Sequence, residues 1–142
     1  MKIMAIDYGD AHTGIAISDY TETLAGYSDT LHSRRQEEVL SGIQRLIAEH
    51  GVQLLVLGYP RNMDGTEGER AAKSRKLATT VKLWSGLPVR MWDERQTTCA
   101  AADLLDESGT YGSKRKEILD SVSATVILDD YLAWRKDHPG EI

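Results

Sequence analysis

Three acidic residues, Asp7, Glu94 and Asp120, occupy positions where a carboxylate has no evident structural role. Asp7 ends the apolar run 2–6 and precedes a turn punctuated by glycine. Asp93 and Glu94 follow a second apolar segment, 87–92, and precede a helical pattern. Ligands bind at strand ends in open α/β sheets, so both positions are candidate sites.

The third acid, Asp120, lies in a helical pattern whose residues at +4, +7 and +11 are Ala124, Ile127 and Tyr131. We expect this mostly apolar stripe to pack against a sheet and to bury the carboxylate. A buried carboxylate needs a partner or a metal ion, and several gathered carboxylates repel one another unless a cation neutralises them. Mg²⁺ and Mn²⁺ prefer carboxylate, water and phosphate oxygens, so the acids predict a magnesium or manganese site.

Gly9 and Gly14 give the first acid a phosphate-binding context. They let the backbone approach a phosphate closely while the Asp7 carboxylate faces the same space. An ordinary hairpin turn with a solvated Asp7 is the plainer interpretation. A third is the phosphate loop of actin-like ATPases and sugar kinases. Those proteins bind nucleotide between two lobes, however, and this chain has room for only one.

The segment 93–98 joins two acids, a base and two hydroxyls at a strand-to-helix junction. The N–H groups at a helix start favour anions such as phosphate. A capped helix start is the plainer interpretation, although capping does not require both Glu94 and Arg95. The strand register decides whether Asp93 or Glu94 faces inward, because a shift of one residue exchanges the faces.

The rest of the chain supplies the elements that must position these residues. Apolar patterning predicts antiparallel strands over 2–7, 14–18 and about 23–31. A helix should follow, with a capping box at Ser33 and Gln36 and a stop at Gly51. The remaining predicted elements are a buried parallel strand at 52–57, a polar loop at 58–68, a helix at about 69–84, a strand at 87–92, a short helix capped by Thr97 or Thr98 and ending near Leu105, and a last helix at roughly 114–135. Together they predict an α/β fold with a mixed five-stranded sheet, flanked by helices, whose middle strand carries Asp7.

Length and composition limit the class of protein. The 142 residues, 41% hydrophobic and 27% charged, predict one globular domain over 1–142 with a flexible tail at about 137–142. No apolar run is long enough for a signal peptide or a membrane span, so we expect a cytoplasmic protein without membrane contact. The single cysteine, Cys99, excludes an internal disulfide and a cysteine-based zinc cluster. A net charge of −5 weighs against a general nucleic-acid binder without excluding one.

Four segments together resemble a known family. They are 5–19, 58–68, 93–98 and 119–124, and they span nearly the whole chain in order. In this arrangement the chain is similar to the YqgF family of RNase H-like nucleases. The resemblance implies an RNase H-like fold, an acidic triad of Asp7, Glu94 and Asp120, and a bacterial cytoplasmic nuclease that processes the 5′ end of pre-16S ribosomal RNA. The family has an older label of Holliday-junction resolvase. It usually carries a basic pair between the two glycines, where this chain has Ala11 and His12.

For phosphodiester hydrolysis we expect Asp7 to anchor one or two Mg²⁺ or Mn²⁺ ions, with Glu94 and Asp120 completing the carboxylate shell. One ion would activate a water, and a second would stabilise the leaving oxygen. The expected contacts with the sugar-phosphate backbone are Gly9, Arg61, Asn62, Lys73, Thr97 and Lys114. The plainer interpretation of each lysine is a solvated surface charge.

The expected partner is nucleic acid, with pre-16S rRNA favoured, ribosomal precursor particles a further candidate and branched DNA the alternative. A junction resolvase would share this chemistry but would need a dimer that presents two sites to a symmetric junction. A non-catalytic RNA-binding assembly factor is a further interpretation, favoured by the acidic net charge and the missing basic pair. RNA and DNA, and monomer and homodimer, stay open at this point.

Overall fold

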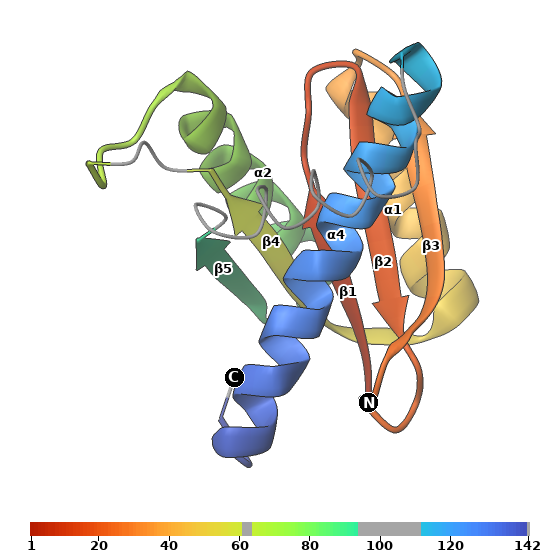
Figure 1. Ribbon diagram of the computed structural model, residues 1–142, viewed down its shortest axis with the longest axis vertical. Coiled ribbons are helices and arrows are strands. Elements are labelled where there is room, and N and C mark those ends of the chain that lie inside the picture. Colours follow the sequence, from red (N-terminus) through yellow and green to blue (C-terminus); the bar gives the residue numbers. More distant parts are fainter. Residues whose placement is uncertain (61–63, 94–111, 142) are drawn as a thin grey trace.

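A five-stranded mixed sheet forms the middle layer of the computed structural model (Figure 1). The structure describes residues 1–60, 64–93 and 112–141, and for 112–121 the backbone alone. The strand order is β3-β2-β1-β4-β5, in which β1 to β3 are antiparallel and β4 and β5 run parallel to β1. The strands are β1 Lys2–Asp7, β2 His12–Ser18, β3 Ala25–His32, β4 Val52–Tyr59 and β5 Val89–Asp93. The predicted mixed sheet with Asp7 on its middle strand is confirmed.

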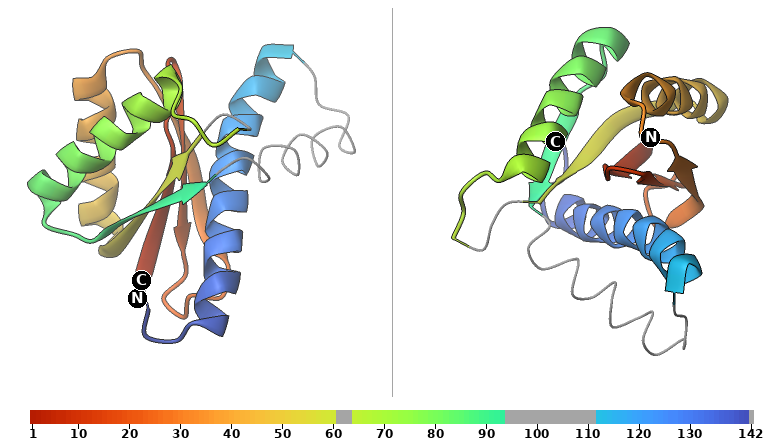
Figure 2. Two further views of the ribbon diagram at one scale, coloured as in Figure 1. Left: turned by 90° about the vertical axis from the view of Figure 1, so that its left-hand side faces the viewer. Right: turned by 90° about the horizontal axis from the view of Figure 1, so that it is seen from above.

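Helices cover both faces of the sheet. They are α1 Gln36–His50, α2 Glu69–Ser85 and α4 Gly112–Asp137. Figure 2 shows α1 and α2 on one face and α4 on the other. The short helix predicted after Thr97 lies outside the described residues. Within the described ranges, no helix is both long and apolar enough to cross a lipid bilayer.

Each face of the sheet has its own apolar core, because side chains alternate along the strands. On β1, Met4 and Ile6 pack toward α1 and α2. Ile3 and Ala5 pack in the opposite direction, against α4. The stripe predicted on the last helix is confirmed, since Ala124, Ile127 and Tyr131 are all fully buried against this second face.

The ends of the helices match the sequence only in part. Gly51 and Gly86 end α1 and α2 in the left-handed conformation, with φ of 67° and 70°, as glycine stops require. The capping box predicted at Ser33 was wrong, because the cap position of α1 is taken by Arg35. The Ser33 hydroxyl instead accepts a hydrogen bond from the Arg35 N–H at 3.0 Å and donates one to Glu38 at 2.6 Å. The Ser33 side chain therefore stabilises a local turn instead of capping the helix.

Candidate functional site

Asp7 is the last residue of β1 and pairs with Gly14 of β2. Its side chain is only 6% exposed. It alternates with Ile3 and Ala5, which belong to the core under α4, so the strand directs Asp7 to the α4 face. The structure therefore places a buried carboxylate at the carboxyl end of the middle strand, where the sequence predicted it.

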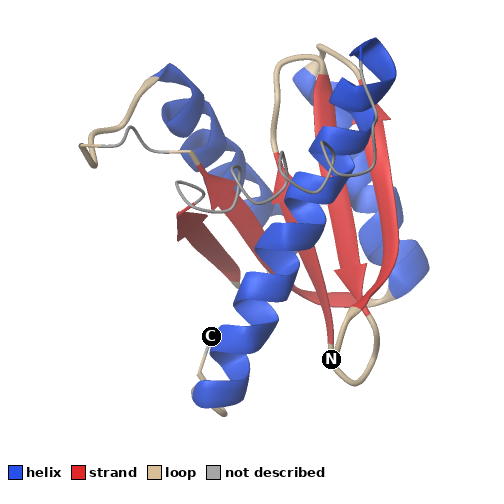
Figure 3. Cartoon of the chain, in the orientation of Figure 1, coloured by secondary structure: helices blue, strands red, loops and turns tan. Residues whose placement is uncertain are grey.

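The ends of the other parallel strands lie at the same edge of the sheet. Figure 3 shows the arrowheads of β4 and β5 side by side there. On β5, Trp92 packs toward α4, whereas Met91 packs toward α1 and α2. Asp93 follows Met91 by two residues, so the alternation directs it away from the face of Asp7. Glu94, the expected ligand, lies outside the described residues.

The third predicted acid belongs to the helix that covers this face. The backbone of Asp120 lies in α4, four residues before the buried Ala124. Figures 1 and 2 show the first half of α4 beside the edge at which β1 ends. Within the described part of the chain, no group of three or more His, Cys, Asp or Glu side chains gathers closely enough to hold a metal ion. Neither Glu94 nor the side chain of Asp120 belongs to that part of the chain.

The Asp7 carboxylate has a cationic partner from another element. Arg70 lies in the first turn of α2, and its Nη2 lies 3.2 Å from Asp7 Oδ1. The arginine side chain is 52% exposed, in contrast to the buried acid. Arg70 was not among the site residues predicted from the sequence. The available signal was its spacing of three from Lys73, at the start of the helix that follows the long polar loop.

Lys73 extends from α2 to the turn that holds Gly9. Its Nζ lies 3.3 Å from Asp10 Oδ1 in the β1–β2 turn and 3.5 Å from Glu69 in the helix. The hydrogen bond and charge of Asp10 raise the pKa of the Lys73 ammonium. In the same turn, a side chain at Gly9 would run into the backbone carbonyl oxygen of His12. Two cations of α2 thus contact acids on either side of Gly9, Asp7 before it and Asp10 after it.

The loop after β4 is fastened at its far end. The Glu67 carboxylate accepts hydrogen bonds from Arg75 at 2.9 and 3.2 Å and from the Tyr59 hydroxyl. These hydrogen bonds, with Arg75 the stronger cause, hold the pKa of Glu67 below its ordinary value. The remaining predicted phosphate contacts are not described: Arg61, Asn62 and Thr97 lie outside the described residues, and only the backbone of Lys114 is described, within α4.

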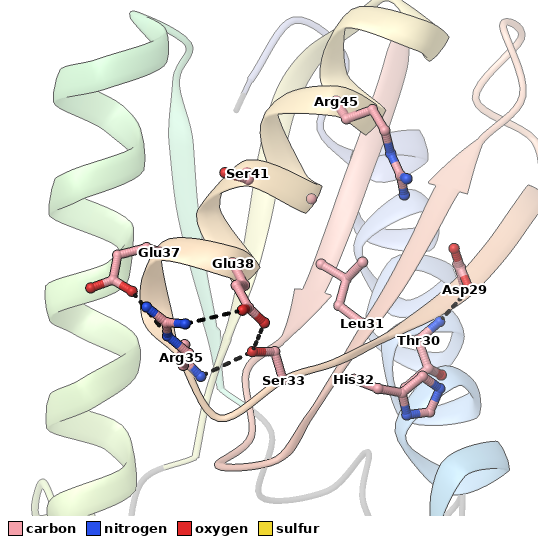
Figure 4. Close-up of a pocket in the computed structure, with 11 residues that line it drawn as sticks. Asp29, Thr30, Leu31, His32, Ser33, Arg35, Glu37, Glu38, Ser41 and Arg45 are labelled. Atoms are coloured by element: carbon pink, nitrogen blue, oxygen red, sulfur yellow. Dashed lines mark hydrogen bonds and ion pairs between the residues drawn. The ribbon is translucent and has the colours of Figure 1, made fainter.

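A groove with a volume of about 690 Å³ lies away from Asp7, between β3 and α1 (Figure 4). Its two arginines are paired with acids of α1 or its start, since Arg35 lies 3.6 Å from both Glu37 and Glu38 and Arg45 lies 3.9 Å from Glu49. Mutually neutralised charges offer little attraction to a polyanion. Asp7 does not line this groove, so the candidate site for phosphate chemistry is the edge at which β1 ends.

Comparison with known proteins identifies the family of this chain. A family model described as "RuvX: Holliday junction resolvase" matches residues 1–134. The chain belongs to the RuvX family. A relative in Halothermothrix orenii, named "Putative pre-16S rRNA nuclease", is 38% identical over 135 residues, which cover 95% of this chain and 96% of the relative. A relative of the same name in Acetivibrio thermocellus is 40% identical over 134 residues, 93% of this chain and 95% of that one. RuvX and YqgF are two names of one family, so the family resemblance expected from the motifs is confirmed.

Solved structures share the fold of this RuvX-family chain. Thermus thermophilus RuvC in complex with a Holliday junction substrate superposes with a TM-score of 0.58, at 12% identity, over 96% of both chains. Fowlpox virus resolvase in complex with Holliday junction DNA gives 0.56 at 11% identity, over 98% of this chain and 99% of that one. At such identities the likeness concerns architecture, and it confirms the predicted RNase H-like fold.

Proposed function

We propose that this RuvX-family chain is a metal-dependent nuclease in which Asp7, Glu94 and Asp120 hold Mg²⁺ or Mn²⁺. The observation that carries the proposal is the buried Asp7 carboxylate at the carboxyl end of the middle strand, on the face that α4 covers. Carboxylate oxygens are hard donors that suit these two ions. The alternation of side chains along β5 supports Glu94 over Asp93 as the second ligand, because Asp93 follows Met91 by two residues and is thereby directed to the face opposite Asp7.

When bound, the metal ion activates a water as nucleophile and stabilises charge that develops on the phosphate. The protein holds its carboxylates in place on rigid elements, with Asp7 on the middle strand and Asp120 on α4. Gly9 belongs to the turn that we expect to contact the sugar-phosphate backbone, and Lys73, which lies 3.3 Å from Asp10 of that turn, is close enough to hold a phosphate there. Arg61, Asn62, Thr97 and Lys114 complete the proposed set of backbone contacts.

Pre-16S rRNA is the substrate that we favour, with cleavage in the cytoplasm or on ribosomal precursor particles. The support is the shared name of relatives that match this chain over nearly its whole length. The description of the family model supports branched DNA as the alternative substrate. The latter would require a homodimer that places two sites on one symmetric junction.

The experiment compares cleavage of a precursor rRNA leader and a synthetic four-way junction, side by side, in Mg²⁺, Mn²⁺ or EDTA. We expect Asp7→Asn to reduce cleavage by at least about 100-fold, because changes in the outer shell of a metal site alone cost 10–100-fold. Asp130→Asn, on an exposed position of α4, is the charge-matched control and should retain activity. Activity that survives both EDTA and Asp7→Asn would overturn the proposal.

A non-catalytic assembly factor is the second candidate, and the Ala11-His12 departure favours it. A titration with Mn²⁺ separates the two functions. The nuclease proposal expects binding that Asp7→Asn abolishes, whereas a vestigial site would bind Mn²⁺ poorly and respond little to this substitution.

A further inference from the structure

The ion pair between Asp7 and Arg70 joins two side chains in very different surroundings. The Asp7 carboxylate is 6% exposed, and the Arg70 guanidinium that contacts it at 3.2 Å belongs to a side chain that is 52% exposed. A buried carboxylate is costly without a cationic partner. In this structure Arg70 supplies that partner from solvent, at the position where the proposed function requires a metal ion.

A divalent cation and a guanidinium compete for such a carboxylate, because both are positive and would repel each other at close range. The arginine is the weaker competitor. Exposed ion pairs typically change an equilibrium by no more than about fivefold, and the half-exposed guanidinium of Arg70 is open to the same screening by water. A divalent ion that several carboxylates hold at once is therefore expected to displace Arg70, whose long side chain can rotate into solvent.

The start of α2 stays close to the site when this pair is broken. Lys73, one turn further along α2, contacts Asp10 in the β1–β2 turn at 3.3 Å. This second contact joins α2 to the turn that follows β1 and does not involve Asp7. A released Arg70 would thus remain within side-chain reach of a phosphate at the end of β1.

We propose that Arg70 is a phosphate-binding residue that Asp7 holds in reserve until a divalent cation binds. This inference rests on the proposed function. The planar guanidinium offers two parallel N–H donors that match two phosphate oxygens, and release from Asp7 frees them for the substrate. Metal binding and the contact of Arg70 with phosphate are then coupled, and each favours the other to the same extent.

The first test measures Mn²⁺ binding without nucleic acid, by electron paramagnetic resonance. Arg70→Gln removes the competitor and should bind Mn²⁺ about three- to fivefold more tightly than the wild type. Arg45→Gln removes an equal charge from α1, where Arg45 pairs with Glu49, and should leave the affinity unchanged. An affinity of Arg70→Gln equal to or weaker than that of the wild type, with the thermal melt unchanged, overturns the inference.

The second test measures binding of a short oligonucleotide in Ca²⁺, another cation that prefers oxygen ligands, and in EDTA. Arg70→Gln should weaken oligonucleotide binding about fivefold or more in Ca²⁺. In EDTA the loss should be much smaller, because Arg70 of the wild type stays paired with Asp7 when no cation is bound. Arg70→Lys keeps the charge but lacks the planar guanidinium, so its affinity for the oligonucleotide in Ca²⁺ should lie between those of the wild type and Arg70→Gln. An equal loss with and without the cation overturns the coupling.

Failure of this inference is distinguishable from failure of the proposed function. Mn²⁺ binding that Asp7→Asn leaves intact refutes the metal site itself, and with it the role of Arg70. If Asp7→Asn abolishes Mn²⁺ binding and Arg70→Gln does not alter it, the nuclease proposal stands. Only the reserve role of Arg70 is then refuted.

Discussion

His12 of β2 and His32 of β3 are paired across neighbouring antiparallel strands, with their Nδ1 atoms 2.9 Å apart. One ring must donate its proton and the other must accept it. His12 lies between Gly9 and Gly14, in the segment where the family resemblance led us to expect a basic pair. Here that side chain is engaged by a neighbour, so it offers less positive charge to a phosphate than an arginine would.

His12→Arg should therefore strengthen the binding of oligonucleotides, by about threefold or more at low salt, and should steepen the salt dependence by about one phosphate contact. The measurement is a binding titration over a series of salt concentrations. His12→Gln breaks the same histidine pair without adding charge and serves as the control. Equal affinities for the two variants would show that residue 12 does not contact the backbone of the nucleic acid.

Gly9→Ala should destabilise the protein and weaken Mn²⁺ binding, because the added methyl group meets the backbone oxygen of His12. Overpacking against atoms that cannot move typically costs about 1–3 kcal/mol. Gly42→Ala is the matched comparison, since its methyl group meets only the Leu31 side chain, at 2.9 Å, and alanine favours the helix. Urea unfolding of both variants measures the difference, and a Gly9→Ala protein as stable as Gly42→Ala would contradict this account of the turn.

The Glu67 anchor of the β4–α2 loop should have a defined pH dependence. Arg75 and Tyr59 hold the pKa of Glu67 below its ordinary value of 4.5. The anchor therefore contributes stability that is fully present above pH 4.5 and is lost as the pH falls through the lower folded-state pKa. Thermal melts between pH 7 and pH 3 should show wild type and Glu67→Gln converging at the acidic end. A difference that stays constant over this range would argue against the anchor.

Two serines of α2 should respond in opposite directions to alanine. Ser74 is fully buried, and within the described part of the chain its hydroxyl has no hydrogen-bond partner. Ser74→Ala should raise the free energy of unfolding by about 1 kcal/mol, since it removes a buried unsatisfied group. The Ser85 hydroxyl donates to the Val81 carbonyl at 2.7 Å and accepts from the Leu87 N–H, so Ser85→Ala should lower it by about 0.5–1.5 kcal/mol. Calorimetry of both variants tests the pair.

The sequence predicted those features that depend on neighbours along the chain. Alternating and helical apolar patterns located the strands and helices, and Gly51 marked the end of α1. The capping box failed because Ser33 had an equally local alternative in the turn before α1. The last strand starts at Val89, two residues later than predicted, although the Pro88 carbonyl still accepts a hydrogen bond from Leu55.

Contacts between distant segments were beyond reach of the sequence. Arg70 and Asp7 are separated by 63 positions, and only the docking of α2 beside the end of β1 brings them together. The face of the sheet to which Asp93 points was also beyond prediction, because it depends on the register of β5 against β4. Asp7 could be found because it ends an apolar strand, whereas its partner lay among several similar basic residues of one helix.

The arrangement of α4 has a consequence for how the protein emerges from the ribosome. Among the described elements, this helix alone covers the face formed by Ile3, Ala5, Ala16, Leu54 and Val56, and it is the last to be synthesised. The strands of that face are thus translated well before their cover, with apolar side chains open to other nascent chains. A stalled or truncated product that lacks residues 124–132 would expose this surface permanently, and it should aggregate or be degraded.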